Sequence, residues 1–135
     1  MPITNANILL VEDDSFISSM YHTKLTGIGF KVSIAEDGET AWEALQKDPL
    51  PDLLLLDIVL PKKDGFEILA ELRKSKRTEN LPVILLTNLG QKPDVERGVQ
   101  LGADDYIIKA HYTPTEVVDK ITKLLESRQG AAQKA

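Results

Sequence analysis

The stretch LLLLDIVLP, residues 53–61, places one acidic side chain at the end of a run of four leucines. A continuous apolar run of this length is typical of a strand that is covered on both faces, as in a parallel sheet. Asp57 follows the run directly, and Pro61 ends the apolar segment. The stretch therefore predicts a buried central strand with a carboxylate fixed at its carboxyl end.

Working outward, short apolar runs alternate with segments whose apolar residues are three and four apart, the spacing of amphipathic helices. Gly27 and Gly102 are suited to end two of these helices. The alternation predicts a doubly wound, flavodoxin-like α/β fold: a five-stranded parallel sheet of order 2-1-3-4-5, flanked by five helices. The expected strands are residues 8–11, 32–35, 53–56, 83–86 and 106–108, and the expected helices centre on residues 17–25, 41–45, 66–72, 92–101 and 117–125.

The length of 135 residues suits one domain with a single core, which we assign to residues 1–128. Residues 129–135 are small and polar, so we expect a flexible tail there. The net charge of -5 argues against direct nucleic-acid binding. Acidic residues interrupt every long apolar run, which argues against membrane insertion and a signal peptide, so we expect a cytoplasmic protein.

Polar residues follow every predicted strand, but the second strand lies at the far side of a 2-1-3-4-5 sheet, so we set aside Glu36 and Asp37 and keep the groups after the other four. They are Glu12 and Asp13 after the first, Asp57 after the third, Thr87 after the fourth and Lys109 after the fifth. In doubly wound sheets, ligands bind beyond the carboxyl ends of the strands, where these groups would meet.

Three carboxylates at one sheet edge repel one another unless a cation lies between them. Mg²⁺ prefers oxygen ligands and keeps positions open for water and phosphate, so Glu12, Asp13 and a backbone carbonyl suit it. Asp57, held by a buried strand, is the candidate nucleophile that would form an aspartyl phosphate. Lys109 would neutralise the phosphoryl oxygens, and Thr87 would donate a hydrogen bond to one of them.

Each residue also has a purely structural interpretation. Asp14 is best explained as the N-cap of the first helix. Glu12, Asp13 and Lys109 could be solvated loop charges, and Asp57 could be a turn residue. Taken together, these interpretations leave suitable groups at four strand ends unexplained, so we favour the functional one.

The segments ILLVEDD, LLLLDIVLPKKDGFE, VILLTN and GADDYIIKA resemble the receiver domain of two-component response regulators, over about residues 6–127. The stand-alone chemotaxis regulators of that family are similar in length and motif placement. The resemblance implies that a sensor histidine kinase or phosphotransfer protein phosphorylates Asp57 in a Mg²⁺-dependent reaction. It also implies a single-domain regulator, not an ordinary enzyme, whose signal passes to a downstream target protein.

The same resemblance assigns roles to individual residues. It implies that Asp13 binds the metal directly, that Glu12 acts through water, and that the carbonyl of Val59 completes the shell. It further implies a phosphate-binding lysine, a switch hydroxyl and a switch aromatic residue, which correspond to Lys109, Thr87 and Tyr106.

Three positions depart from the family pattern. One is Asn88, next to Thr87, which is larger than the small residue common there and would narrow access to the site. Ala110 stands where a proline usually follows the lysine, and a cis bond to alanine would cost about 3 to 4 kcal/mol, so the geometry of this loop stays open. Val59 cannot orient an attacking water, which suggests slow loss of the phosphoryl group.

The fourth helix has few apolar anchors and an internal glycine, Gly98, so we expect it to be weakly held. This predicts an output face made of the fourth helix, fifth strand and fifth helix, with Tyr106 changing its burial.

Three other functions remain open. An aspartyl-phosphate phosphatase usually has a second acid where Val59 stands, and a flavodoxin-like binder needs a hydroxyl-rich loop in place of VEDDS. The main alternative is a pseudo-receiver, a phosphorylation-independent interaction module, against which the acids at the strand ends argue.

Overall fold

The computed structural model describes residues 5–134, and the side chains of residues 5–128. Five parallel strands lie in the order β2-β1-β3-β4-β5, which confirms the predicted sheet. The strands are β1 (Asn7–Val11), β2 (Lys31–Ala35), β3 (Leu53–Leu56), β4 (Val83–Thr87) and β5 (Asp105–Ile108). The helices are α1 (Ser15–Ile28), α2 (Gly38–Leu45), α3 (Gly65–Lys74), α4 (Lys92–Gln100), the short 3₁₀ helix η1 (Lys109–His111) and α5 (Pro114–Lys134).

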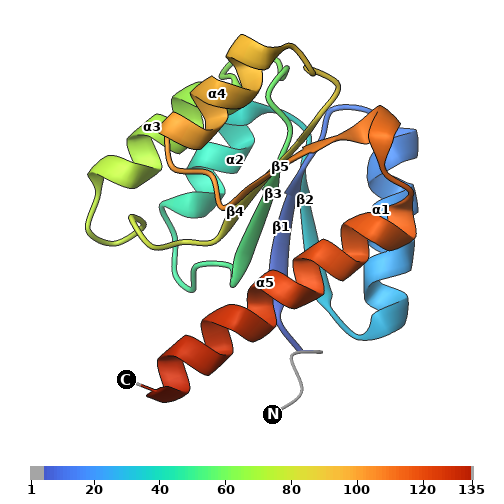
Figure 1. Cartoon of the computed structure of the whole chain (residues 1–135), viewed down its shortest axis with the longest axis vertical. Coiled ribbons are helices and arrows are strands. Elements are labelled where there is room, and N and C mark those ends of the chain that lie inside the picture. The colour runs from blue at the N-terminus through green and yellow to red at the C-terminus, as the bar shows by residue number, and fades with distance from the viewer. Residues whose placement is uncertain (1–4, 135) are drawn as a thin grey trace.

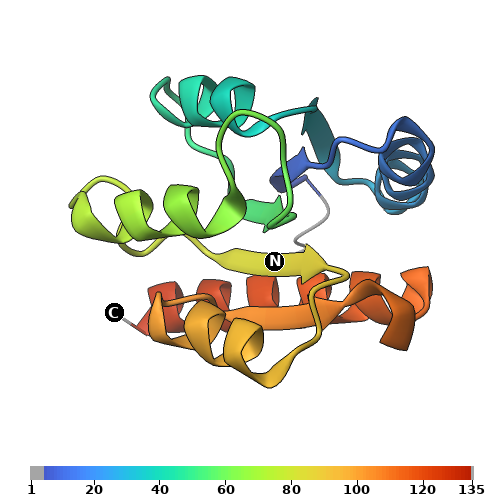
Figure 2. The same ribbon diagram turned by 90° about the horizontal axis from the view of Figure 1, so that it is seen from above.

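The helices cover both faces of the sheet, with α2, α3 and α4 on one side and α1 and α5 on the other (Figures 1 and 2). The strands run upward in Figure 1, so the loops after their carboxyl ends gather at the top of the view. The central strand β3 pairs with β1 on one side and β4 on the other, and all four of its leucines are buried. The uninterrupted leucine run therefore lies where both faces are covered.

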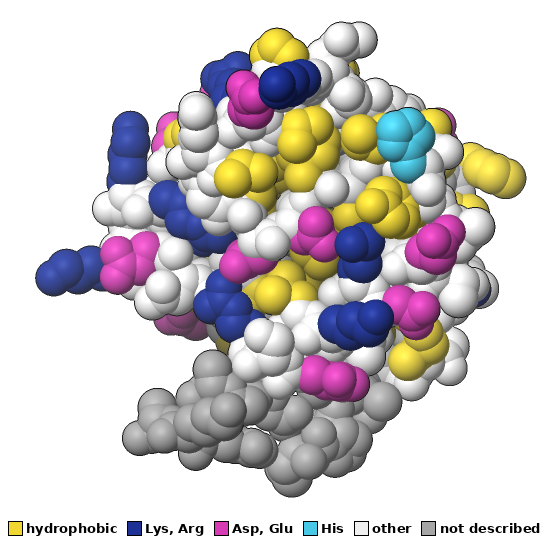
Figure 3. All heavy atoms as spheres, viewed as in Figure 1, with side chains coloured by type: hydrophobic (Ala, Val, Ile, Leu, Met, Phe, Trp, Pro, Cys, Tyr) yellow, Lys and Arg dark blue, Asp and Glu magenta, His cyan; other side chains and the backbone are white. Residues whose placement is uncertain are grey.

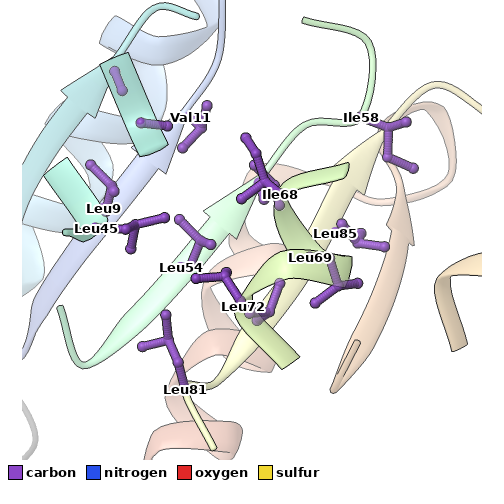
Figure 4. Close-up of a cluster of buried hydrophobic side chains, with 14 of the residues drawn as sticks. Leu9, Val11, Leu45, Leu54, Ile58, Ile68, Leu69, Leu72, Leu81 and Leu85 are labelled. Atoms are coloured by element: carbon purple, nitrogen blue, oxygen red, sulfur yellow. The ribbon is translucent and has the colours of Figure 1, made fainter. Parts of the chain in front are cut away.

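Successive side chains along each strand point to opposite faces of the sheet, so the core consists of two layers, one on each face. Leu54, Leu56 and Leu85 face the α2 and α3 side, where they pack with Leu69 and Leu72 of α3 (Figure 4). The side chains at alternate positions of the same strands face α1 and α5; they are Ile8, Leu10, Leu53, Leu55, Ile84, Leu86 and Ile107. The carboxyl ends of the strands are thus held from both sides.

Helix boundaries follow local capping. The Asp14 carboxylate accepts hydrogen bonds from the amides of Phe16 and Ile17, at 2.9 and 3.1 Å, which confirms it as the N-cap of α1. Gly29, not Gly27, caps the other end of α1, with a φ of 121° that favours glycine. The prediction for Gly27 was therefore wrong: that residue lies within the helix.

The loop after β5 has ordinary backbone geometry. The only cis peptide bond among residues 5–134 is Asp48–Pro49, so the Lys109–Ala110 bond is trans and forms part of η1. This settles the alternative left open by the missing proline.

The last helix is the longest. It continues to Lys134 and so includes residues 129–134 of the segment predicted to be flexible, a prediction that the helix assignment does not test; residue 135 lies outside the described part of the chain. Within residues 5–134, no helix combines the length and the apolar character needed to cross a membrane.

At the amino ends of β4 and β5, an ion-pair cluster joins three segments. The Asp104 carboxylate accepts hydrogen bonds from the Val83 amide at 2.8 Å, from Arg73 at 3.3 Å and from Arg128 at 2.5 Å. Arg73 also donates to the Gly102 carbonyl, at 2.9 and 3.1 Å. The cluster ties α3 and α5 to the start of β5.

Candidate functional site

Asp57 follows β3 directly and is fixed by its backbone. Its amide donates to the Val11 carbonyl at 3.1 Å, and its carboxylate accepts from the Ile58 amide at 2.7 Å. Gly65, the first residue of α3, lies so close that a Cβ there would be 2.4 Å from the Asp57 carbonyl oxygen. Asp57 is only 6% exposed, so the sequence has placed a carboxylate in a nearly buried and rigid position.

Glu12 is the most buried of the acids, at 2% exposure. Its amide donates to the Ala35 carbonyl at 3.0 Å, and its Oε1 accepts from the Asp14 amide at 3.2 Å. Burial raises the pKa of Glu12, and the nearby charge of Asp57 raises it further, although the hydrogen bond from Lys109 opposes both effects. The free protein therefore keeps this carboxylate in an unfavourable environment for its charge.

Lys109 is the counter-charge of both acids. Its Nζ lies 2.6 Å from Glu12 Oε2 and 3.0 Å from Asp57 Oδ2. Burial alone would lower the pKa of the Lys109 ammonium, but its hydrogen bonds and attraction to the two carboxylates outweigh burial and raise the pKa. The sequence predicted a role for Lys109 toward phosphoryl oxygens but neither of these two contacts, because β5 is a neighbour of β4 and not of β3 or β1.

The predicted acids do come together. Glu12, Asp13 and Asp57 each offer a carboxylate oxygen, and these three atoms lie within 4.8 Å of one another. Asp13 is exposed whereas the other two are buried. Oxygen ligands at this separation, two of them held by strand ends, fit a hard divalent cation.

Thr87 and Tyr106 meet through the loop after β4. The Thr87 side chain is fully buried, and its Oγ1 accepts a hydrogen bond from the Leu89 amide at 3.3 Å. The Tyr106 hydroxyl donates to the Leu89 carbonyl at 2.6 Å. Burial, with smaller contributions from the charges of Asp94 and Asp57, raises the pKa of Tyr106 to about 12, so its hydroxyl remains a donor at neutral pH.

A pocket of about 330 Å³ opens above these groups. Its lining combines every predicted catalytic and metal-binding residue with side chains that were not predicted; the full set is Glu12, Asp13, Asp14, Ile17, Asp57, Val59, Thr87, Asn88, Leu89 and Lys109. The Val59 side chain is 61% exposed at the rim. Tyr106 does not line the pocket and reaches it only through Leu89. Ile17 and Leu89 were missed because apolar residues give no chemical signal in a sequence.

A buried, rigid carboxylate in a small acidic pocket, with a lysine and a hydroxyl at neighbouring strand ends, defines a receiver domain. The model of the response regulator receiver domain family matches residues 8–122, and the chain belongs to this family. The family consists of signalling regulators and is not a classical enzyme family. The predicted resemblance is thereby confirmed.

Known proteins agree with this assignment. The transcriptional regulatory protein CpxR of Klebsiella pneumoniae is 42% identical over 126 residues, covering 93% of this chain and 52% of CpxR. A putative response regulator from Chloroflexus aurantiacus is 33% identical with a TM-score of 0.83, covering 90% of this chain and 98% of that one. The Mn²⁺-bound form of response regulator Rcp1 is 31% identical with a TM-score of 0.75, covering 90% of each chain. The chain spans about half the length of the curated relatives it matches.

Proposed function

We propose that this chain accepts a phosphoryl group on Asp57 from a phosphohistidine of a sensor histidine kinase or phosphotransfer protein. The observation that carries the proposal is the position of Asp57: it is 6% exposed, lines the pocket, and lies 3.0 Å from Lys109. A carboxylate held at the end of a buried strand can approach phosphorus with little loss of conformational freedom.

In the transfer, an oxygen of Asp57 forms a bond to phosphorus while the phosphorus–nitrogen bond of the donor breaks. The leaving imidazole keeps the bonding electron pair and takes up a proton. Lys109 would neutralise negative charge on the phosphoryl oxygens, and the Thr87 hydroxyl would donate a hydrogen bond to one of them. For this, Thr87 must turn from its present partner, the Leu89 amide.

The proposed cofactor is Mg²⁺, held by Asp13, Asp57 and the Val59 carbonyl, with Glu12 acting through water. The three carboxylates within 4.8 Å of one another support such a site, as does the similarity to a response regulator whose structure contains Mn²⁺. When bound, the cation would offset the negative charge that gathers as phosphate meets carboxylate. Lys109 alone cannot do this, because it already contacts two acids.

The proposed output surface consists of α4, β5 and α5, which Figure 3 shows from outside, with hydrophobic patches among acidic and basic side chains. Val99 of α4 is 61% exposed on this part of the molecule. A downstream protein that binds here would detect movement of α4 and Tyr106. We propose a cytoplasmic regulator whose receiver domain does not itself contact nucleic acid; the net charge of -5 supports the last point.

The test is intact-mass measurement after incubation with acetyl phosphate, with and without Mg²⁺. The wild type should gain one phosphoryl group only with Mg²⁺, and Asp57→Asn should gain none. Asp14→Asn is the matched control, because it removes a charge beside the pocket while asparagine keeps the capping capacity. No gain by the wild type would favour the alternative, a phosphorylation-independent pseudo-receiver, and a gain by Asp57→Asn would place the phosphoryl group elsewhere.

We further propose that the phosphoryl group is lost slowly. Val59, exposed at the rim, has no group that could orient an attacking water. Val59→Asn should therefore shorten the lifetime of the phosphorylated protein in the same mass assay. An unchanged lifetime would remove this part of the proposal.

A further inference from the structure

The buried residue of α4 is one that has no side chain. Gly98 is the one residue of α4 that is buried, while Val99 beside it is 61% exposed. A Cβ at Gly98 would lie 2.7 Å from Cδ2 of Tyr106 and 2.8 Å from Cδ1 of Leu85. The ring of Tyr106 therefore occupies the space that a side chain at this position would need.

The backbone around Gly98 is anchored on both sides. The Gly98 carbonyl accepts a hydrogen bond from the Ala103 amide at 3.1 Å, just before β5. Arg97, the preceding residue, lies over the ring of Phe66 of α3 at 4.4 Å from the ring centroid. These contacts fix the local position of Gly98, so an added methyl group would act on Tyr106 and Leu85. The methyl group would contact the terminal Cδ1 of Leu85, which is the end of a flexible side chain, and Cδ2 of the rigid Tyr106 ring. The Tyr106 ring would therefore have to move as a whole.

The position of the Tyr106 ring determines whether its hydroxyl can reach the loop that lines the pocket. Its hydroxyl donates to the Leu89 carbonyl at 2.6 Å, and the Leu89 amide donates to Thr87 Oγ1 at 3.3 Å. Leu89 and Thr87 both line the pocket that contains Asp57. Contacts therefore run without a gap from Gly98 through Tyr106 and Leu89 to Thr87.

We propose that Gly98 is a positioning residue: its missing side chain provides the slot that seats the Tyr106 ring, and this seating couples α4 to the pocket loop, residues 88–91. The proposal rests on the proposed function only for its consequence, that a partner bound to α4 would influence the Thr87 hydroxyl. The seating itself is a property of the unphosphorylated protein. It also gives a reason for a glycine inside α4, where glycine weakens a helix.

The experiment measures amide hydrogen exchange in the unphosphorylated protein without Mg²⁺, so its result does not depend on whether Asp57 accepts phosphate. Gly98→Ala should displace the ring, break the hydrogen bond to Leu89 and speed exchange in residues 88–91 roughly fivefold to tenfold relative to β1 and β3, about the effect of losing one hydrogen bond. Nitration of Tyr106, followed by peptide mass mapping, should become faster, while Tyr21 serves as an internal buried reference.

The matched control is Gly27→Ala in α1, where an added Cβ would have no atom within 4 Å. It should change neither the exchange of residues 88–91 nor the nitration of Tyr106. Tyr106→Phe should speed loop exchange as Gly98→Ala does, and the double variant should be no faster than Tyr106→Phe alone.

Unchanged loop exchange in Gly98→Ala, or an equal further acceleration in the Tyr106→Phe background, would overturn the proposal. Should Gly98→Ala alone fail to fold, the proposal is tested with a second double variant, Gly98→Ala combined with Tyr106→Leu. It should fold, because the smaller side chain frees the slot, and its failure to fold would likewise contradict the proposal.

Discussion

Two charged clusters stand at opposite ends of the same sheet, and they balance their charges differently. At the amino ends of β4 and β5, the Asp104 carboxylate receives hydrogen bonds from two arginines and one backbone amide. At the carboxyl ends, one lysine serves two buried acids, Glu12 and Asp57, with Asp13 beside them. In the first cluster, two positively charged arginines and an amide surround one negatively charged carboxylate. In the second cluster, three carboxylates share one lysine, which leaves an excess of negative charge.

The difference separates structural charges from functional ones. At the partly exposed Asp104 cluster every carboxylate oxygen has a cationic or amide donor, whereas a charge left uncompensated at a buried site is costly. The pocket instead holds three carboxylates and one lysine, and the pKa of Glu12 is raised, mainly by burial and in addition by the charge of Asp57, against the opposing hydrogen bond from Lys109. We interpret this shortage of positive charge as the room kept for a cation and a phosphoryl group.

The largest expected effect concerns the satisfied cluster. Asp104→Ala leaves two arginines without their carboxylate and the Val83 amide without its acceptor, and should lower the free energy of unfolding by about 3 kcal/mol, since the cluster is partly exposed. Urea denaturation followed through Trp42 fluorescence measures this. Asp105→Ala removes a half-exposed ion pair with Lys120 at 3.5 Å and the acceptor of the Tyr106 amide at 2.8 Å; it is the control and should cost about 1 kcal/mol. Equal losses in the two variants would mean that the cluster has no special structural role.

A smaller loss is expected when the pocket loses its only lysine. Lys109→Met keeps the length of the side chain but leaves Glu12 and Asp57 facing each other, which should cost about 2 kcal/mol without metal, since the pocket admits water. Adding Mg²⁺ should recover part of this loss. The comparison is Lys120→Met on α5: Lys120 forms a half-exposed ion pair with Asp105 and lies over the ring of Tyr112, and its loss should lower the free energy of unfolding by no more than about 1 kcal/mol. If Lys109→Met were as stable as the wild type without metal, the claim that Lys109 offsets an excess of negative charge in the pocket would be contradicted.

The smallest effect should have the opposite sign. Asp57→Asn removes one of two buried carboxylates that share Lys109, so the metal-free protein should be unchanged or more stable by up to about 1 kcal/mol. Thermal unfolding in the presence of a chelator tests this. A clear loss of stability would show that Asp57 supports the fold in the way that Asp104 does.

Much of the fold could be predicted because its signals are local. The leucine run of residues 53–56, the helical spacing between the runs and the N-cap Asp14 each depend on neighbours in the sequence, and the structure reproduces all three. The C-cap of α1 was misplaced because Gly27 and Gly29 lie two residues apart and only the backbone conformation distinguishes them.

The site was predictable in its residue types but not in its contacts. Strand order brings the ends of β1 and β3 together, so the meeting of Glu12, Asp13 and Asp57 followed from topology. The reach of Lys109 to Glu12 depends on a long side chain that crosses the pocket, and the Tyr106–Leu89 contact depends on how the loop after β4 folds. Neither leaves a pattern along the sequence.

The most direct test of the excess negative charge is calorimetric titration of the metal-free protein with Mg²⁺. The wild type should bind one ion, Asp57→Asn should bind it at least about tenfold more weakly, and Asp104→Asn, at the other end of the sheet, should bind it as the wild type does. Absence of Mg²⁺ binding by the wild type, or equal binding by Asp57→Asn, would contradict the account.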